Sequence, residues 1–319
     1  KETSIGYNRV GGIDGKIRIN GKNSIDYNFF RSFSDDTINF KAGNNFGAHY
    51  NYKDRYNDFL VGYYQNDENF NTETGYLTRK GLHNFPITYN LNIPLKSEKI
   101  NKIGIWLNAR PKINMSNHKF EYWSYAGFEL YFKNDSWLWM GKSFSEEIFQ
   151  NKTFNAGYIG SGYFIQLNKY VYVQGYVGLE NKIYYDEVNP YQGYGLSTNQ
   201  TLLFTPTNQL KIKLSGVFEN FYKTSNDDFV YDYTLARLHT TYQLNKSLFV
   251  RAIGEYNFYK EKLGAELLVS FTYIPGTVIQ LGYNLNAVKN LMDRNMMPIE
   301  DLTVNKNLLF FKASYLFNK

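Results

Sequence analysis

The chain has 319 residues and a net charge of +6, and 18% of its residues are aromatic, with 30 tyrosines and 25 phenylalanines. It contains no run of 18 consecutive apolar residues, which excludes a transmembrane helix, and its lack of cysteine excludes disulfides. Acidic and basic residues are mixed along the whole sequence without a long basic cluster, so nucleic acid is not expected as a partner.

The N-terminal part of the chain contains strand patterns that are interrupted. The first, Thr3–Arg9, is short and poorly patterned. Later segments are Leu82–Ile93, which contains Pro86, and a strand near Ile105, which contains Pro111. Because proline cannot donate a hydrogen bond to a β-ladder, each proline is predicted to mark a strand start, a bulge or a rim.

Three segments farther along alternate between two chemically different faces. They are Phe120–Phe132, Leu210–Tyr222 and Leu248–Phe258. One face is mainly apolar, with residues such as Ile212 and Leu214. The opposite face carries Glu121, Glu129, Lys213, Glu219, Arg251 and Glu255. Charged side chains are costly against lipid, so the second face is predicted to line a wet lumen.

The C-terminal segment has the clearest alternation. Residues Leu267–Ile274 and Thr277–Asn286 alternate around a tight two-residue turn, and a final strand, Leu309–Phe317, ends on an aromatic residue near the last position. Strands with a period-2 apolar face, closed by a C-terminal aromatic, are typical of outer-membrane β-barrels. This register predicts that Leu281 faces lipid and Gln280 faces the lumen.

The connections between predicted strands alternate in length. Counting back from the C-terminus, every second connection is short, apart from Lys96–Asn101: Pro275-Gly276, Asn245–Ser247, Thr205–Gln209, Asn168-Lys169, Asn134–Ser136, Arg55–Asn57 and Asn20–Asn23. The others are generally longer or more acidic: Val288–Asn307, Tyr259–Leu263, Lys223–Phe229, Tyr185–Pro190, Gln150–Thr153 and Asp67–Lys80. Short turns on one side and long loops on the other indicate a transmembrane barrel whose short side is periplasmic.

These patterns predict an all-β fold, an antiparallel transmembrane β-barrel of about 16–18 strands. The barrel occupies residues 1–319, and strands outside this chain could complete it. The mean hydropathy of −0.48 agrees, because one face of each strand meets lipid and the other meets water. We expect the protein in the outer membrane of a Gram-negative bacterium, with periplasmic termini and with membrane lipid and lipopolysaccharide around it.

Three parts of the sequence resemble a family of large Bacteroidota envelope proteins, the domain-of-unknown-function 5916 group (DUF5916). They are Tyr7–Arg18, Phe70–Gly81, and Tyr273–Thr277 together with the closing Phe310–Phe317. The second is similar to the family's Phe-Asn-Pro-Glu-x-Gly-Phe-x-x-Arg pattern and departs from it at Thr72, where proline is usual.

The resemblance implies a barrel in the outer membrane, and it implies no known activity and no catalytic residues. In this family a module similar to carbohydrate-binding family 9 precedes the barrel, and this sequence lacks it. We therefore expect a C-terminal fragment of a longer protein. The expected partners are the N-terminal part of the same protein and other envelope proteins.

No catalytic, cofactor or metal site is predicted. The four histidines are scattered without paired spacing: His49, His83, His118 and His239. Glu146 and Glu147 are adjacent in a strand, so they face opposite ways and cannot share acid–base work. The acidic segment Asp67–Glu73 offers oxygen ligands for calcium but lacks the spacing of a dedicated calcium loop, so a solvated loop is the favoured interpretation.

Two further sets of residues each have two interpretations. Trp137 and Trp139 follow a tight turn, and a periplasmic-side aromatic girdle is favoured over a sugar-stacking platform. Six charged residues either line a permeation path or form a packed polar network that fills the lumen: Arg110, Lys142, Lys213, Glu219, Arg251 and Glu255.

The leading hypothesis for the function is a channel or transport barrel for a solute, related to glycans if the family resemblance holds. The alternative is a plugged barrel that acts as a scaffold or docking partner in a secretion or surface-assembly complex. The protein is not expected to be an enzyme, because no acid, base and nucleophile converge in the sequence pattern.

Overall fold

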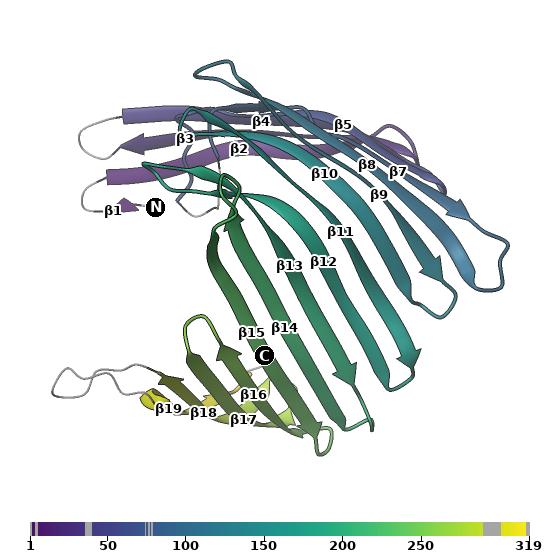
Figure 1. Cartoon of the computed structure of the whole chain (residues 1–319), viewed down its shortest axis with the longest axis vertical. Helices are drawn as coiled ribbons and strands as arrows, with labels where there is room; N and C mark the ends of the chain where they lie inside the picture. The colour runs from purple at the N-terminus through teal and green to yellow at the C-terminus, as the bar shows by residue number, and fades with distance from the viewer. Residues whose placement is uncertain are drawn as a thin grey trace. The chain divides into compact units, whose positions relative to one another are not determined.

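A computed structural model of the chain describes residues 2–3, 6–35, 40–73, 75, 77, 79–289 and 301–316. In these residues the regular secondary structure is β-strand, and the strands belong to a 19-stranded sheet (Figure 1). Two strands, β1 (Glu2–Thr3) and β6 (Leu82–Asn84), have two and three residues. The other 17 strands agree with the predicted 16–18 strands. Among the described residues, no helical segment has the length and hydropathy of a membrane span.

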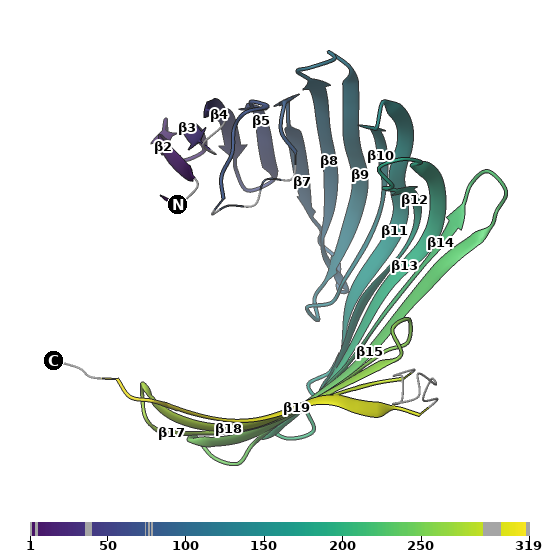
Figure 2. The same cartoon turned by 90° about the vertical axis from the view of Figure 1, so that its left-hand side faces the viewer.

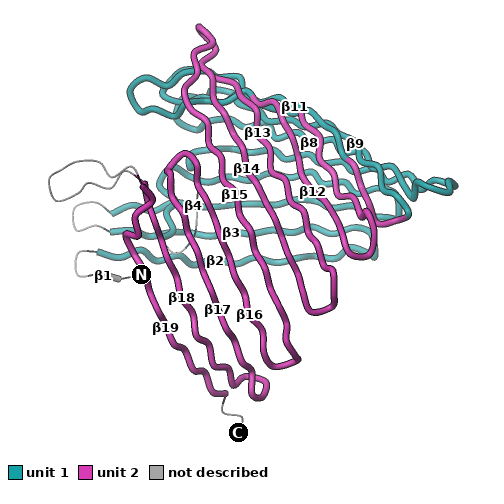
Figure 3. Tube along the Cα trace, turned by 60° about the horizontal axis from the view of Figure 1, so that its bottom comes forward, with its two compact units in different colours: residues 1–133, 139–159, 181–192 teal, residues 134–138, 160–180, 193–319 magenta. Residues whose placement is uncertain are grey.

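Two compact units divide the chain, and Figure 3 colours them separately. The first unit comprises residues 1–133, 139–159 and 181–192, and the second comprises residues 134–138, 160–180 and 193–319. Within each unit the strands follow one another side by side in chain order (Figure 2).

The first unit contains, besides β1 and β6, the following strands: β2 (Gly6–Arg18), β3 (Asn23–Asp35), β4 (Phe40–Lys53), β5 (Asn57–Asn66), β7 (Ile87–Pro94), β8 (Ile100–Asn114), β9 (Phe120–Phe132) and most of β10 (Trp137–Phe149). The second unit contains β14 (Leu210–Lys223), β15 (Phe229–Gln243), β16 (Leu248–Asn257), β17 (Lys262–Ile274), β18 (Thr277–Val288) and β19 (Thr303–Ser314). Like β10, three further strands contribute to both units: β11 (Lys152–Asn168), β12 (Val171–Tyr184) and β13 (Tyr191–Phe204).

The sheet of the second unit has an apolar face and a polar face, as the alternation predicts. Leu281 lies in one row with Val269 and Phe311, and its side chain is 49% exposed on the apolar face. Its neighbour Gln280 lies opposite Ser270 on the polar face and donates a hydrogen bond to the Ser270 hydroxyl (3.4 Å). Because side chains alternate along a strand, one register sets both faces.

The first unit follows the same rule. Ile13, Phe29 and Phe46 form one row across β2, β3 and β4, and all three are exposed. The opposite face of the same strands carries the row of Lys16, Asp26 and His49. We call the face of Lys16 the polar face of this unit. The predicted separation of apolar and charged side chains is therefore present in both units.

The two prolines break one ladder without changing its register. Pro86 separates β6 from β7, so this proline marks a strand start, as predicted. Pro111 lies inside β8, and its carbonyl accepts a hydrogen bond from the Phe85 amide (3.0 Å). In an antiparallel ladder the N and O of one residue point to the same side. The missing donor of Pro111 therefore points to the interruption at Phe85, and the pairing of β8 with β9 is intact.

Several predicted boundaries are wrong. The first long strand is β2 (Gly6–Arg18) rather than Thr3–Arg9, because glycines in this segment hide its apolar alternation. β19 begins at Thr303, which shortens the predicted loop Val288–Asn307. Only residues 150 and 151 separate β10 from β11, so the contrast in connection length depends mainly on residues 67–81 and 289–302. The closing residue Phe317 lies outside the described residues.

Leu281→Arg should destabilise the protein by about 2–4 kcal/mol, because it places a charge on the apolar face at a depth where lipid is expected. Gln280→Arg, one residue away on the polar face, should cost much less. The free energy of unfolding, measured by guanidinium titration in lipid vesicles, tests both variants. Equal losses would contradict the assignment of the two faces.

Candidate functional site

Residues 67–81 connect β5 to β6, and their described part (67–73, 75, 77 and 79–81) folds onto the polar face of the first unit. The Asn71 amide donates to the Ser32 hydroxyl of β3 (3.0 Å), and the Asn71 carbonyl accepts from the Asn8 amide side chain of β2 (3.1 Å). The Glu73 amide donates to the side-chain oxygen of Asn8 (3.2 Å). Asn8 and Ser32 are buried, so these bonds hold the connection against the wall of the sheet.

The connection packs closely on β4 through Phe70. The Phe70 side chain is only 5% exposed. Gly43 of β4 allows this approach, because a Cβ atom at Gly43 would lie 2.1 Å from the Phe70 nitrogen. A glycine within a strand often marks such a close approach of another backbone. We call residues 67–81 the inward loop.

Asp67 anchors the start of the inward loop. Its carboxylate accepts hydrogen bonds from the Asn44 amide (2.8 Å), the Asn44 side chain (2.9 Å) and the Gln65 side chain (2.6 Å). Burial raises the pKa of Asp67, but these hydrogen bonds outweigh it and the pKa lies below its ordinary value. The prediction of a solvated acidic loop therefore fails at Asp67, whereas Glu68 and Glu73 are exposed. The Asp67 carboxylate binds protein donors, which also disfavours the calcium alternative.

Arg79 fixes the end of the inward loop to β9. Its guanidinium donates two hydrogen bonds to the Glu121 carboxylate, at 2.6 and 2.8 Å. Glu121 is 1% exposed, whereas the Arg79 side chain is 33% exposed. Such a bidentate pair is geometrically specific and stronger than a neutral hydrogen bond. The inward loop is thus attached at one end to β2–β4 and at the other to β9.

A cavity of about 520 Å³ lies beside this ion pair within the first unit. Arg79 and Glu147 line it with opposite charges, Phe149 and Tyr185 line it with aromatic rings, and several asparagine and glutamine side chains complete the wall. The two rings meet edge to face with centroids 5.2 Å apart. Burial and the nearby Glu147 raise the pKa of Tyr185 to about 12, so its hydroxyl is a neutral donor. With Ile148, the lining combines apolar surface with a few polar groups, as ligand pockets commonly do.

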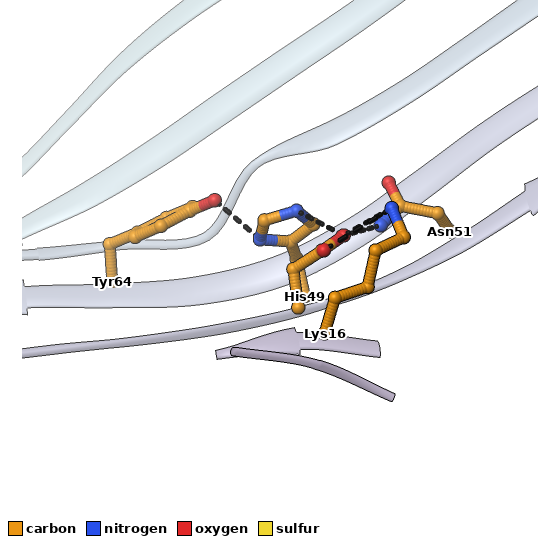
Figure 4. A network of polar contacts seen from close by, with 5 residues as sticks. Lys16, His49, Asn51 and Tyr64 are labelled. Atoms are coloured by element: carbon orange, nitrogen blue, oxygen red, sulfur yellow. Dashed lines mark hydrogen bonds and ion pairs between the residues drawn. The ribbon is translucent and has the colours of Figure 1, made fainter. Parts of the chain in front are cut away.

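A second polar cluster joins four strands of the same face (Figure 4). Asp26 of β3 accepts from Lys16 of β2 (3.3 Å) and from Asn51 of β4 (2.5 Å), and its carboxylate lies 3.3 Å from His49 Nε2. The other ring nitrogen of His49 lies 2.6 Å from the hydroxyl of Tyr64 in β5. This chain of contacts cross-links β2, β3, β4 and β5. It ends at the Tyr64 hydroxyl, which contacts the His49 ring.

Arg110 and Lys142, both predicted to line the lumen, lie on opposite faces of the first unit. The Arg110 guanidinium lies over the Trp123 ring of β9 at 5.4 Å, on the face that holds Glu121. Lys142 alternates with the buried Gly141 and Ser143, and its ammonium lies 4.7 Å from the centre of the exposed Phe144 ring. Lys142 therefore belongs to the apolar face, and its assignment to the polar set is wrong.

The other four predicted residues share the polar face of the second unit. Lys213 and Glu219 lie on β14, and Arg251 and Glu255 lie on β16, with β15 between them. Glu255 pairs with Arg237 of β15, whose Nε donates to it at 2.6 Å. Glu219 accepts from the Tyr231 hydroxyl (3.3 Å). Their role as lumen-lining residues stays a prediction.

Trp137 does not lie on the apolar face, where the predicted aromatic girdle requires it. Trp137 stacks on Phe164 of β11, with centroids 6.2 Å apart and planes 18° apart. It lies on the opposite face from Leu138 and Met140, which are exposed. An aromatic belt that meets lipid would have to lie on the same face as Leu138 and Met140. The period-2 rule could have shown this, because Leu138 and Met140 form the apolar stripe of β10.

The described residues contain no group of three or more histidine, aspartate or glutamate side chains that could hold a metal ion. The histidines are separate: His83 contacts Tyr63 (2.7 Å), His239 contacts Thr241 (3.3 Å), and His118 lies in a connection with a φ of 54°. Glu147 lines the cavity, and Glu146 is not among its lining residues. The absence of enzymatic activity stays a prediction.

Sequence reasoning missed Arg79, His239 and Arg237 as members of polar sites. The strand β15 carried a usable signal, since Tyr233, Arg237 and His239 alternate with apolar residues. Arg79 falls on the arginine of the family's pattern, but its partner Glu121 is distant in sequence and only the fold brings the two together.

No protein-family model matches the chain, and no curated protein matches it. Among solved structures, the chain is similar to the siderophore receptor PirA from Acinetobacter baumannii, with a TM-score of 0.56 and 7% sequence identity. The similarity covers 95% of this chain and 64% of the receptor chain. At this identity the likeness shows a shared fold. Together with the strand ladders, it confirms the predicted class, an all-β antiparallel β-barrel fold.

Glu121→Gln should release the inward loop. The substitution removes the charge-assisted hydrogen bonds of Arg79, which are worth about 1.5–3 kcal/mol, so local opening should increase at least about tenfold. Trypsin cleavage after Arg79 or Lys80 measures this opening. Glu129→Gln is the matched control, because Glu129 is a buried carboxylate on the same face of β9. Equal cleavage of the two variants would contradict the role of Glu121.

The anchor at Asp67 should weaken only in acid. Because its folded-state pKa lies below the ordinary value of about 3.9, its stabilisation is present above that pH and is lost as the pH falls through the folded-state pKa. Hydrogen exchange of residues 67–73, normalised to unstructured peptide, should therefore be slow at pH 5 and become faster as the pH falls through the folded-state pKa of Asp67. Asp67→Asn should abolish this pH step, and a step that persists in the variant would assign it to another group.

Proposed function

We propose that the chain forms the wall of an outer-membrane β-barrel that transports a polar solute, with membrane lipid and lipopolysaccharide against its apolar face. The polar face then lines the transport path. The short turns and the termini lie on the periplasmic side of a Gram-negative outer membrane in this proposal. The likeness to a siderophore receptor supports a barrel transporter in general, and it does not assign a siderophore to this chain.

The observation that carries the proposal is the division of each unit into two faces. Leu281, Leu214 and Leu238 are about half exposed on the apolar face of the second unit. A soluble protein has little reason to expose such a continuous apolar stripe. In a bilayer the same stripe meets lipid, and the charged residues on the opposite face remain in water.

The inward loop gives the transport path a selective element. It lies on the polar face, so a solute that moves along this face of the first unit meets the loop. The cavity beside Arg79 and Glu147 offers both charges, amides and aromatic rings to such a solute. A polar molecule with several hydroxyl groups has the matching hydrogen-bonding chemistry. We therefore propose that the inward loop restricts passage and selects for polar solutes.

Membership of the DUF5916 family is part of the same proposal. The similar stretches Tyr7–Arg18 and Phe70–Gly81 include β2 and most of the inward loop, which contact each other through Asn8. The resemblance would thus lie in a structural unit, the wall and the loop that packs on it. The chain spans 64% of the receptor to which it is similar, so an activity of the whole receptor is not assigned to it.

Purified protein in planar lipid bilayers should show steady single-channel openings. Glu121→Gln should raise the conductance because it frees the inward loop, whereas Glu129→Gln should leave it unchanged. A silent protein that co-purifies with stable envelope partners would contradict transport and support the alternative of a plugged scaffold. Equal conductance of the two variants would still support a pore. It would contradict the proposal that the inward loop restricts passage through it.

A further inference from the structure

The polar face of the second unit carries four lysine and arginine side chains and one histidine on three neighbouring strands. We call this cluster the basic patch, and its members are Lys211, Lys213, Arg237, His239 and Arg251. Lys213 of β14 lies directly opposite His239 of β15, and Thr241 lies between Lys211 and Arg251 in the next row. The register thus places Lys211, Arg237 and Arg251 in the rows next to the pair of Lys213 and His239, on the same face.

Acidic side chains compensate only part of this charge. Glu255 pairs with Arg237. In the described part of the chain, no carboxylate lies within salt-bridge distance of Lys211, Lys213 or Arg251. Glu266 of β17 is diagonal to Arg251 in the ladder and accepts a hydrogen bond from Asn284 (3.3 Å). The basic patch therefore keeps a net positive charge.

Glu219 does not neutralise the basic patch either. It lies on the same face of β14 as Lys213 but six residues farther along, which is about 20 Å in a strand. Its carboxylate accepts from Tyr231, at the opposite end of β15 from His239. Charges at this separation are largely screened at physiological ionic strength.

Arg251 supplies a second, independent observation. Its Nε atom is sealed from solvent and has no hydrogen-bond acceptor in the described structure. A buried donor without an acceptor is costly, and for a charged group the cost is greater. Arginine is also the side chain best suited to bidentate contact with carboxylate, sulfate or phosphate. The Arg251 residue as a whole is only partly buried, so its guanidinium can offer N–H groups to an anion in the water of the polar side.

The strand register also decides which anion can reach the basic patch. Leu214 and Leu238, which alternate with patch residues, are 50% and 47% exposed on the apolar face. The patch is on the other face, so the phosphate groups of lipids around the apolar face are excluded. The ligand must come from the water that fills the polar side.

From these observations we infer that the basic patch binds the oxyanion group of a transported solute. The ligand class is a small molecule that carries a carboxylate, sulfate or phosphate. Arg251 and Lys213 are the main contacts, and His239 and Thr241 add hydrogen-bonding groups between them. The inference rests on the proposed transport function for its physiological meaning. The binding itself does not require an open pore.

Binding of inorganic phosphate to the full chain in detergent tests the inference directly. Phosphorus NMR line broadening should show binding to the wild-type protein, and Lys213→Gln combined with Arg251→Gln should weaken it by about tenfold for each charge removed. Lys213→Arg, which keeps the charge and leaves Arg251 in place, should largely retain it. Lys142→Gln, which removes a cation from the apolar face, should have no effect.

Absence of phosphate binding to the wild-type protein would overturn the inference whatever the variants do. Equal loss in the Lys142→Gln control would also overturn it, because the effect would then reflect net charge alone. Bilayer recordings separate this test from the proposed function. The reversal potential in a salt gradient should indicate anion preference in the wild type and a reduced preference in the double glutamine variant. A silent protein that still binds phosphate would reject transport and leave the basic patch in place.

Discussion

The period of two along each strand is the constraint on which the rest of the structure depends. Backbone hydrogen bonds fix the register, and the register then assigns every side chain to one of two faces. Leu281 and Gln280 are adjacent in sequence, yet one is exposed with Phe311 and the other is bonded to Ser270. Because the backbone satisfies its own polar groups within the sheet, one face can be apolar without exposing unpaired donors.

The alternation allowed the sheet and most of its polar face to be predicted from sequence. Phe120–Phe132 and Leu267–Ile274 both form strands, and Arg251 and Glu255 share one face as expected. The prediction failed where the same rule was not applied strictly. Lys142 was assigned by its charge, although Met140 and Phe144 on either side of it already indicated the apolar face.

The inward loop could not be predicted in the same way, since its position depends on contacts between distant residues. Asp67 was expected in a solvated acidic segment, because composition does not show which donors will surround a carboxylate. Gly43 makes room for the Phe70 backbone, and a glycine within a strand does not by itself show which segment will approach it. Local patterns therefore predict the wall of the sheet, whereas the elements that lie on the wall require the fold.

The pair of Arg79 and Glu121 has a consequence for the order of folding. The two residues are 42 positions apart, and Asn8 and Glu73, which also meet across the inward loop, are 65 apart. The loop can dock completely only after β2 and β9 have both joined their sheet. Contacts of such long range form late, because loop closure must precede them. The inward loop is therefore expected to dock only after β2 through β9 have assembled.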